Sequence, residues 1–304
     1  MKIAIHTVFI LKENILFLEE WIYYHILLGF NKFYLYDNSK MNKVTGFDNK
    51  PNHKIIGNKV NKYGINYDKI VNMTDTQMNQ YVQKLCEKYK CIEIIEWSPT
   101  DKEGNILYQQ DGAHNHCLKK LKNDKIDWCA NIDMDEYIVI KDSDNIGKYI
   151  SSLPRKIKNI KLGQIRFDSR FNNVDKLVTD ITDCEIKDLY RNHSNKNIYN
   201  VKNTIKVKTH SIILNKFIFN FILSVVIMYI SKVVGLFTFI YPMRELSQSL
   251  ATMSQSLATN EYIPSTKEIW FNHYKMSDNN YKHVNNINVN IKTKLNKYSF
   301  VTFK

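Results

Sequence analysis

One stretch of the chain decides the predicted fold: Trp128-Cys129-Ala130-Asn131-Ile132-Asp133-Met134-Asp135-Glu136-Tyr137-Ile138-Val139-Ile140. Two apolar runs, each as long as a short buried strand, flank the carboxylates of Asp133, Asp135 and Glu136. Carboxylates this close repel one another and lose hydration, so a positive charge is needed among them. A divalent cation suits this role, because hard cations take oxygen ligands and keep positions open for phosphate. The stretch therefore predicts a strand that ends in a metal-binding turn; a solvated acidic turn between two strands is the alternative.

The N-terminal forty residues predict a β-α-β unit. Residues 3–10 read as a buried strand rich in β-branched residues, and residues 17–28 carry apolar side chains at helical spacing. Gly29 is a suitable helix stop. Residues 32–36 form the second strand, which ends in the turn-forming run 37–39. Parallel strands joined by a helix imply an open α/β sheet that binds ligands at the carboxyl ends of its strands.

The middle of the chain continues the alternation of strands and helices, although residues 40–80 are polar and predict a mixture of loop and helix. Further strands are predicted at 91–97, 161–167 and 204–209, and further helices at 81–89, 108–121 and 146–153. For most histidines and tryptophans the sequence predicts a structural role. His25, Trp21, Trp128 and Trp270 are expected in the core, and His114 and His116 face differently on one helix, which argues against a shared metal site.

The composition changes sharply at residue 212. Residues 212–241 are almost wholly apolar and are followed by a short tandem repeat, Ser247-Gln248-Ser249-Leu250-Ala251-Thr252 and Ser254-Gln255-Ser256-Leu257-Ala258-Thr259. About twenty apolar residues suffice to span a bilayer. We expect a hairpin or tilted helix that dips into one leaflet, with a buried core hairpin as the alternative. The predicted division is 1–211 and 261–304 for the catalytic domain and 212–260 for the apolar insertion.

Charge and cysteine usage narrow the partners and the compartment. The 304 residues carry a formal net charge of +13, which suggests anionic partners such as a nucleotide diphosphate or a membrane surface. The basic residues are scattered, so we expect no nucleic-acid partner. Five cysteines without a CxxC pair fit a reducing compartment, and the charged start, residues 1–5, lacks a signal-peptide pattern. These features predict a membrane-associated protein on the cytoplasmic side.

Three motifs of the chain occur in a fixed order. The first is Lys12-Glu13-Asn14…Phe17-Leu18-Glu19-Glu20-Trp21-Ile22…Tyr24-His25…Leu28-Gly29…Phe33-Tyr34-Leu35-Tyr36-Asp37-Asn38. The second is Ile132-Asp133-Met134-Asp135-Glu136-Tyr137, similar to an Asp-x-Asp motif, and the third is Asn272-His273-Tyr274. Together they resemble glycosyltransferase family 92, the DUF23 group. The resemblance implies a GT-A-like, Rossmann-like α/β fold with an open, mostly parallel sheet flanked by helices, here with an apolar helical insertion.

The resemblance also implies a set of donor-site residues. Asp135 would hold the metal, Mn²⁺ or Mg²⁺, directly, and Asp133 would hold the metal or the donor ribose. His273 would be a further metal ligand or a diphosphate donor. Thr7, Glu13 and Asp37 would line the nucleoside pocket, with a turn or cap role as the alternative for Glu13 and Asp37. The implied donor is a nucleotide-diphosphate sugar, UDP-linked, with galactose as a candidate sugar.

The acceptor side is the least specified part of this prediction. In an inverting transferase a carboxylate deprotonates the acceptor hydroxyl, and Asp168, just past a predicted strand, is the first candidate, with Glu185 second. The segment 167–171 lacks the glycine of the family pattern. A glycan, protein or lipid acceptor is expected. The alternatives are a catalytically degenerate binding protein at a membrane and a metal-dependent nuclease, although no second acidic cluster supports the nuclease.

Overall fold

The fold was analysed in a computed structural model of the chain. It describes residues 1–15, 17–41, 71, 73–169, 187–190, 196–215, 261–262 and 268–276. Of residues 165–169, 187–190 and 272–276 it describes the backbone alone. The helices are α1 (Leu11–Asn14), α2 (Leu18–Leu27), α4 (Asp75–Lys88), α5 (Gln110–Asn123), α6 (Ile146–Ser152) and the 3-10 helix η1 (Val201–Asn203).

The strands fall into one large sheet and one small one. The large sheet contains β1 (Ile3–Phe9), β2 (Lys32–Asp37), β3 (Ile92–Glu96), β4 (Trp128–Asn131), β5 (Glu136–Ile140), β6 (Asn159–Ser169), β7 (Lys187–Tyr190), β8 (Lys196–Asn200), β11 (Glu261–Tyr262) and β12 (Ile269–Met276). Its main order is β3-β2-β1-β4-β8-β6-β12-β5. The first four strands of this order are mutually parallel, and the rest of the sheet is mixed.

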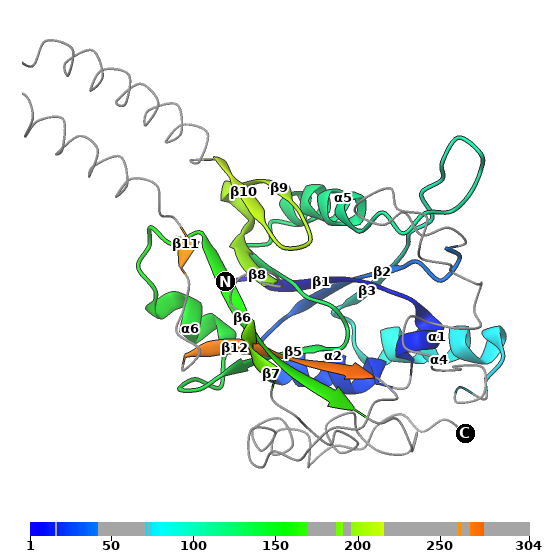
Figure 1. The fold of residues 1–304 in the computed structure, drawn as a ribbon, viewed down its shortest axis with the longest axis horizontal. Helices are drawn as coiled ribbons and strands as arrows, with labels where there is room; N and C mark the ends of the chain where they lie inside the picture. The colour runs from blue at the N-terminus through cyan, green and yellow to red at the C-terminus, as the bar shows by residue number, and fades with distance from the viewer. Residues whose placement is uncertain are drawn as a thin grey trace, which may run out of the picture.

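Helices cover both faces of the parallel half (Figure 1). On one face, α2 packs with Ile3, Ile5 and the β5 residues in the larger apolar cluster. On the other, α5 packs with Ala4 and Val8 in a second cluster. The α/β fold with an open sheet flanked by helices is therefore confirmed, with the parallel pairing concentrated at β3, β2, β1 and β4.

The elements predicted from hydrophobic spacing are present. Strands β1, β2 and β3 and helices α2, α5 and α6 lie within a few residues of their expected bounds. His25 and Trp21 are fully buried, and Trp128 and Trp270 are 8% and 9% exposed, as expected of core side chains. The sequence did not predict β7 or β8, because both fall in a polar stretch with weak alternation.

The apolar insertion is described only at its start. Ile212–Leu214 is strand β10, which pairs antiparallel with β9 (Thr204–Val207) in a two-stranded sheet. The remainder of the predicted insertion, from residue 216 to 260, lies outside the described residues. Among the residues that are described, no helix is long and apolar enough to cross a bilayer.

Candidate active site

The acidic turn lies between β4 and β5, at the carboxyl end of the parallel strands. Strand β4 ends at Asn131, and β5 begins at Glu136. The turn closes through two contacts: the Glu136 amide donates to the Asp133 carbonyl at 3.1 Å, and the Asp133 amide donates to Glu136 Oε2 at 2.8 Å. Met134 points into the core, 2% exposed. One carboxylate oxygen each of Asp133, Asp135 and Glu136 lies within 4.8 Å of the others, as a shared cation requires.

Helix α2 fixes the strand that follows this turn. The Trp21 indole N–H donates to the Glu136 carbonyl at 2.8 Å, and the Tyr24 hydroxyl donates to the Ile138 carbonyl at 2.6 Å. His25 Nδ1 bonds to the Trp21 carbonyl, which makes Nε2 the acceptor that faces the Ile138 amide at 3.4 Å. These bonds satisfy backbone groups of β5, which is an edge strand among the strands that the structure describes. The first sequence motif therefore holds the second in place.

A lysine fills the space between two of the three carboxylates. Lys196 is the first residue of β8, which runs antiparallel to β4 with Asn197 opposite Asn131. Its Nζ lies 2.7 Å from Asp133 Oδ2 and 3.3 Å from Glu136 Oε2. Burial by itself would lower the pKa of Lys196, but the neighbouring carboxylates of Asp133 and Glu136 raise it above its usual value. The side chains of Lys196 and Glu136 are 2% and 3% exposed, whereas that of Asp133 is 36% exposed.

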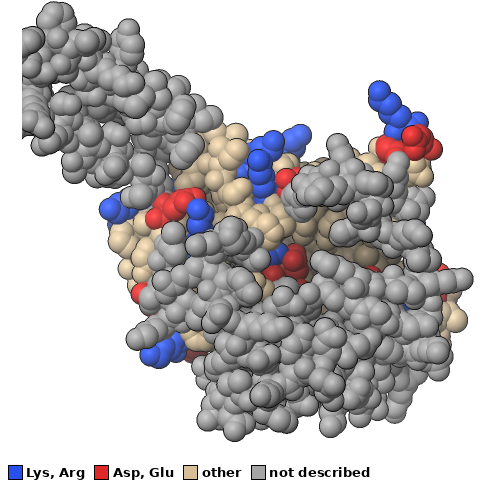
Figure 2. Space-filling model, viewed as in Figure 1, with Lys and Arg blue, Asp and Glu red and all other residues tan. Residues whose placement is uncertain are grey.

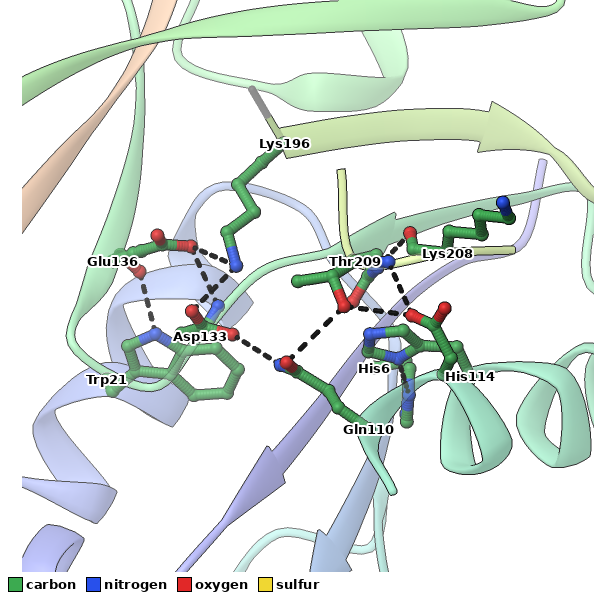
Figure 3. A network of polar contacts seen from close by, with 11 residues as sticks. His6, Trp21, Gln110, His114, Asp133, Glu136, Lys196, Lys208 and Thr209 are labelled. Atoms are coloured by element: carbon green, nitrogen blue, oxygen red, sulfur yellow. Dashed lines mark hydrogen bonds and ion pairs between the residues drawn. The ribbon is translucent and has the colours of Figure 1, made fainter. Parts of the chain in front are cut away.

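The second oxygen of Asp133 is held from helix α5. Gln110 Nε2 donates to Asp133 Oδ1 at 3.2 Å, and the Thr209 hydroxyl oxygen lies 3.4 Å from Gln110 Oε1 (Figure 3). Thr209 is fixed in turn by Asp111, whose Oδ1 accepts from its amide and hydroxyl at 2.9 Å. Both Asp133 oxygens thus contact donors that come from distant parts of the chain, α5 and β8.

Other ionisable groups crowd the same turn. Burial, with the Asp135 charge adding to it, raises the pKa of Glu13 on α1 to about 7. Tyr108, just before α5, has a pKa raised first by burial and then by the charges of Asp133, Glu13 and Asp135. Glu13 therefore lies close enough to the acidic turn to feel its charge, as a shared donor site requires.

The predicted nucleoside residues lie at the same edge of the sheet. Thr7 on β1 is 1% exposed, and its hydroxyl has no hydrogen-bond partner among the described residues. Asn38, directly after β2, donates to the carbonyls of Trp97 and Leu107 and leaves its own Oδ1 buried and unbonded within that part of the chain. Asp37 accepts from the amide and hydroxyl of Ser39, so its carboxylate closes a turn, and burial raises its pKa. Unbonded buried oxygens at a ligand-binding edge suit a polar ligand.

The histidines of α5 face apart, as the sequence predicted. His114 is fully buried and its Nδ1 lies 2.7 Å from His6 Nε2. Burial lowers the pKa of His6 to about 3 and that of His114 well below its usual value, so the pair is neutral. His116 instead contacts the Tyr36 hydroxyl at 2.7 Å.

The backbone brings the third motif to the acidic turn. Strand β12 pairs antiparallel with β5, with His273 opposite Glu136, and parallel with β6, with His273 opposite Arg166. The expectation that Asp168 follows a strand end is wrong, because β6 continues through Asp168 to Ser169. Pairing with β12 extends over this part of β6 and places Lys275 opposite Asp168. The side chains of His273 and Asp168, and all of Glu185, lie outside the described residues, so their roles stay predictions.

The sequence analysis did not predict the roles of two side chains of the site, those of Lys196 and Gln110. Lys196 stands in a polar stretch, and only the adjacent pair Ile198 and Tyr199 supplies apolar side chains to its strand. Gln110 lay inside a predicted helix, but nothing local indicated that its amide reaches a residue 23 positions away. Both contacts depend on pairing between distant segments.

Charges of both signs occur on the face that carries these elements. In Figure 2 the blue side chains of the described residues lie in separate places and form no continuous stripe, and red acidic atoms lie near the middle with a basic group beside them.

Fold and site together define the class: a GT-A-like α/β fold with an Asp-x-Asp turn at the carboxyl edge of its parallel strands. The family model of Glycosyltransferase family 92 matches residues 62–299, well over half of the chain. The chain belongs to glycosyltransferase family 92. The matched residues include the second and third motifs, whereas the first motif precedes them.

Other comparisons add little. No curated protein matches the chain. One solved structure, described as "The crystal structure of apo- UDP-glucose pyrophosphorylase", is 10% identical and covers 90% of both chains, with a TM-score of 0.28. A likeness at this TM-score supports no structural argument. The protein is a glycosyltransferase by its family, and a nucleotide-sugar donor and a glycan acceptor follow from that family.

Proposed function

We propose that this glycosyltransferase moves a sugar from a UDP-linked donor to an acceptor hydroxyl, with a divalent ion bound at the acidic turn. The observation that carries the proposal is the convergence of Asp133, Asp135 and Glu136 at the carboxyl edge of the parallel strands. In open α/β sheets, ligands bind at this edge. The proposed transferred group is a hexosyl group, with galactose as the first candidate.

The residues at the turn fit a divalent ion. Their ligand atoms are carboxylate oxygens, the type that Mn²⁺ and Mg²⁺ prefer, and Asp133 keeps a third of its side chain exposed. Asp135 is the proposed direct ligand, with Asp133 and His273 completing the set. When bound, such an ion neutralises the charge that develops on the leaving diphosphate.

The protein's own groups supply the remaining contacts of the proposed donor site. Thr7 and Asn38 have buried oxygens without partners in the described chain, and both lie at the ends of neighbouring strands. A nucleoside offers amide and hydroxyl donors for such oxygens. Glu13 and Asp37 border the same edge. Asp168 remains the first proposed base for the acceptor hydroxyl, and Glu185 the second.

The acceptor and the location of the protein are also proposals. The apolar residues 212–241 and the net charge of +13 support attachment to an anionic membrane surface on the cytoplasmic side. Such attachment suits a lipid-linked or membrane-bound glycan acceptor. A variant in which a short Gly/Ser linker replaces residues 216–240 should no longer co-sediment with anionic liposomes and should still bind UDP. Co-sedimentation that persists in this variant would contradict the membrane role.

The experiment that tests the transferase proposal is a screen of nucleotide sugars. With Mn²⁺ present, the purified chain should slowly hydrolyse one UDP-sugar, releasing UDP, and chelation of the metal should stop the release. UDP binding without hydrolysis of any donor in the panel would favour the catalytically degenerate binding protein instead.

A further inference from the structure

Lys196 is a charged side chain that is almost fully buried at the acidic turn. It is 2% exposed, and its ammonium lies between Asp133 Oδ2 at 2.7 Å and Glu136 Oε2 at 3.3 Å. Figure 3 shows the side chain reaching from β8 toward the turn that carries both carboxylates. Removing a lysine from water costs several kcal/mol, which only close anionic partners offset. A lysine in this position therefore neutralises the charge of the carboxylates that it contacts.

These contacts engage the oxygens that a metal would need. Asp133 Oδ2 contacts Lys196, and Oδ1 accepts from Gln110. Glu136 Oε2 contacts Lys196 and also accepts from the Asp133 amide. A divalent ion that binds Asp133 Oδ2 or Glu136 Oε2 must share that oxygen with the ammonium or displace it, and an ion held by Asp135 beside them is still repelled by the nearby ammonium charge.

We propose that Lys196 is a resident counter-cation that competes with the divalent ion for Asp133 and Glu136, and so keeps the metal affinity of the nucleotide-free protein low. The inference rests on the proposed function, because it presupposes that the acidic turn binds a metal. Metal and nucleotide then enter together, since the diphosphate brings negative charge and oxygen ligands of its own. Lys196 thereby couples the two binding events, as a positioning residue that acts through the carboxylates.

The test compares metal binding by Lys196→Met with that of the wild type. Methionine keeps much of the side-chain volume but removes the charge. We expect the dissociation constant for Mn²⁺ alone, measured by the loss of the free-ion EPR signal, to fall by about tenfold, within the usual range of coupling between two sites. The matched control is Lys161→Met on the neighbouring strand β6, which removes a 2.7 Å ion pair with Glu261 of β11 and should leave Mn²⁺ affinity unchanged.

Stability gives a second readout that does not depend on turnover. Without metal, Lys196→Met leaves two carboxylates without their ammonium and should unfold at a lower temperature. Mn²⁺ should restore much of this loss, while it raises the Tm of the wild type and of Lys161→Met only slightly. Lys196→Gln, which can still donate a hydrogen bond, should also bind Mn²⁺ more tightly, because the competition is between charges.

The outcomes separate this inference from the proposed function. One outcome is that the wild type binds Mn²⁺ and UDP together, while both Lys196 variants bind Mn²⁺ as the wild type does or more weakly. This outcome would overturn the proposed competition but would still support the proposed donor site. Failure of both variants to fold at saturating Mn²⁺ would also overturn it, since the ion then cannot replace the ammonium. No Mn²⁺ binding by any form, with or without UDP, would contradict the proposed function itself.

Discussion

Two sites in the described part of the chain, at Glu19 and at the acidic turn, bury a carboxylate beside a lysine, and the charge is compensated differently at each. On α2, Glu19 accepts from Lys88 and Tyr89 at 2.9 Å and from Tyr81 at 3.4 Å. At the acidic turn, Asp133 and Glu136 share the ammonium of Lys196. One carboxylate has an ammonium and two hydroxyl donors to itself at the first site, whereas at the second two carboxylates share one ammonium, beside the donors Gln110 and the Asp133 amide.

The groups that surround Glu19 and the acidic turn differ as well. The Glu19 donors all come from α4 and the residue after it, so the cluster joins two neighbouring helices. The acidic turn has Asp135 within ligand distance and Glu13 close enough for its pKa to rise to about 7. Concentrated negative charge destabilises a fold unless a positive charge offsets it, so the comparison separates a structural ion pair from the acidic turn that we propose holds a cation.

The largest expected effect is the loss of donor binding in Asp135→Asn. The substitution keeps the shape but removes the proposed metal ligand, and the affinity for UDP in the presence of Mn²⁺ should fall by more than the ~10–100-fold typical of residues that only orient a ligand. Isothermal titration calorimetry measures this. Asp144→Asn, which alters an exposed ion pair with Lys148, is the control and should bind like the wild type. Wild-type UDP affinity in Asp135→Asn would reduce the acidic turn to a structural feature.

A stability effect without a binding effect is expected at the other site. Glu19→Ala removes the acceptor for three donors and should lower the free energy of unfolding by about 2 kcal/mol, the scale of hydrogen bonds to a charged group. Urea denaturation measures the loss, and UDP affinity below the transition should stay the same. A changed affinity with unchanged stability would reverse the roles assigned to the two sites.

A smaller effect is expected from pH. The pKa of Glu13 is raised in the folded protein, so the folded state binds more protons than the unfolded state between about pH 4.5 and 7. The free energy of unfolding contributed by this group therefore falls as pH rises through that interval. In metal-free buffer, Glu13→Gln should show a shallower decline than the wild type in denaturation curves taken across these pH values. Parallel declines in the two proteins would show that the pKa of Glu13 is not raised in the folded protein.

Much of the fold was predictable because its signals are local. Strands β1 and β2 and helix α2 follow from apolar spacing over fewer than forty residues, and the turn that carries Asp133 and Asp135 follows from one short stretch. The indole of Trp21 was correctly expected in the core, but its bond to the Glu136 carbonyl depends on packing between segments 115 residues apart.

Lys196 shows why the rest of the site was not predictable. It stands 63 positions from Asp133, in a strand whose polar composition hides its burial. Its place follows from β8 running antiparallel to β4, so that the start of one strand lies beside the end of the other. No local pattern encodes that pairing, since the register of distant strands is set by the assembled sheet.

The most direct measurement of the central claim is thermal unfolding of the wild-type chain with UDP alone, Mn²⁺ alone, both together, and both together with excess chelator. The acidic turn is claimed to bind a nucleotide diphosphate and a divalent ion as one unit. Binding at a hundredfold excess over the dissociation constant stabilises a fold by about 2.7 kcal/mol. The account predicts that the two ligands together raise the Tm by several degrees, more than the sum of their separate effects, and that the chelator removes the gain. An equal rise with UDP in the presence of chelator, or no rise with both ligands at millimolar concentration, would contradict it.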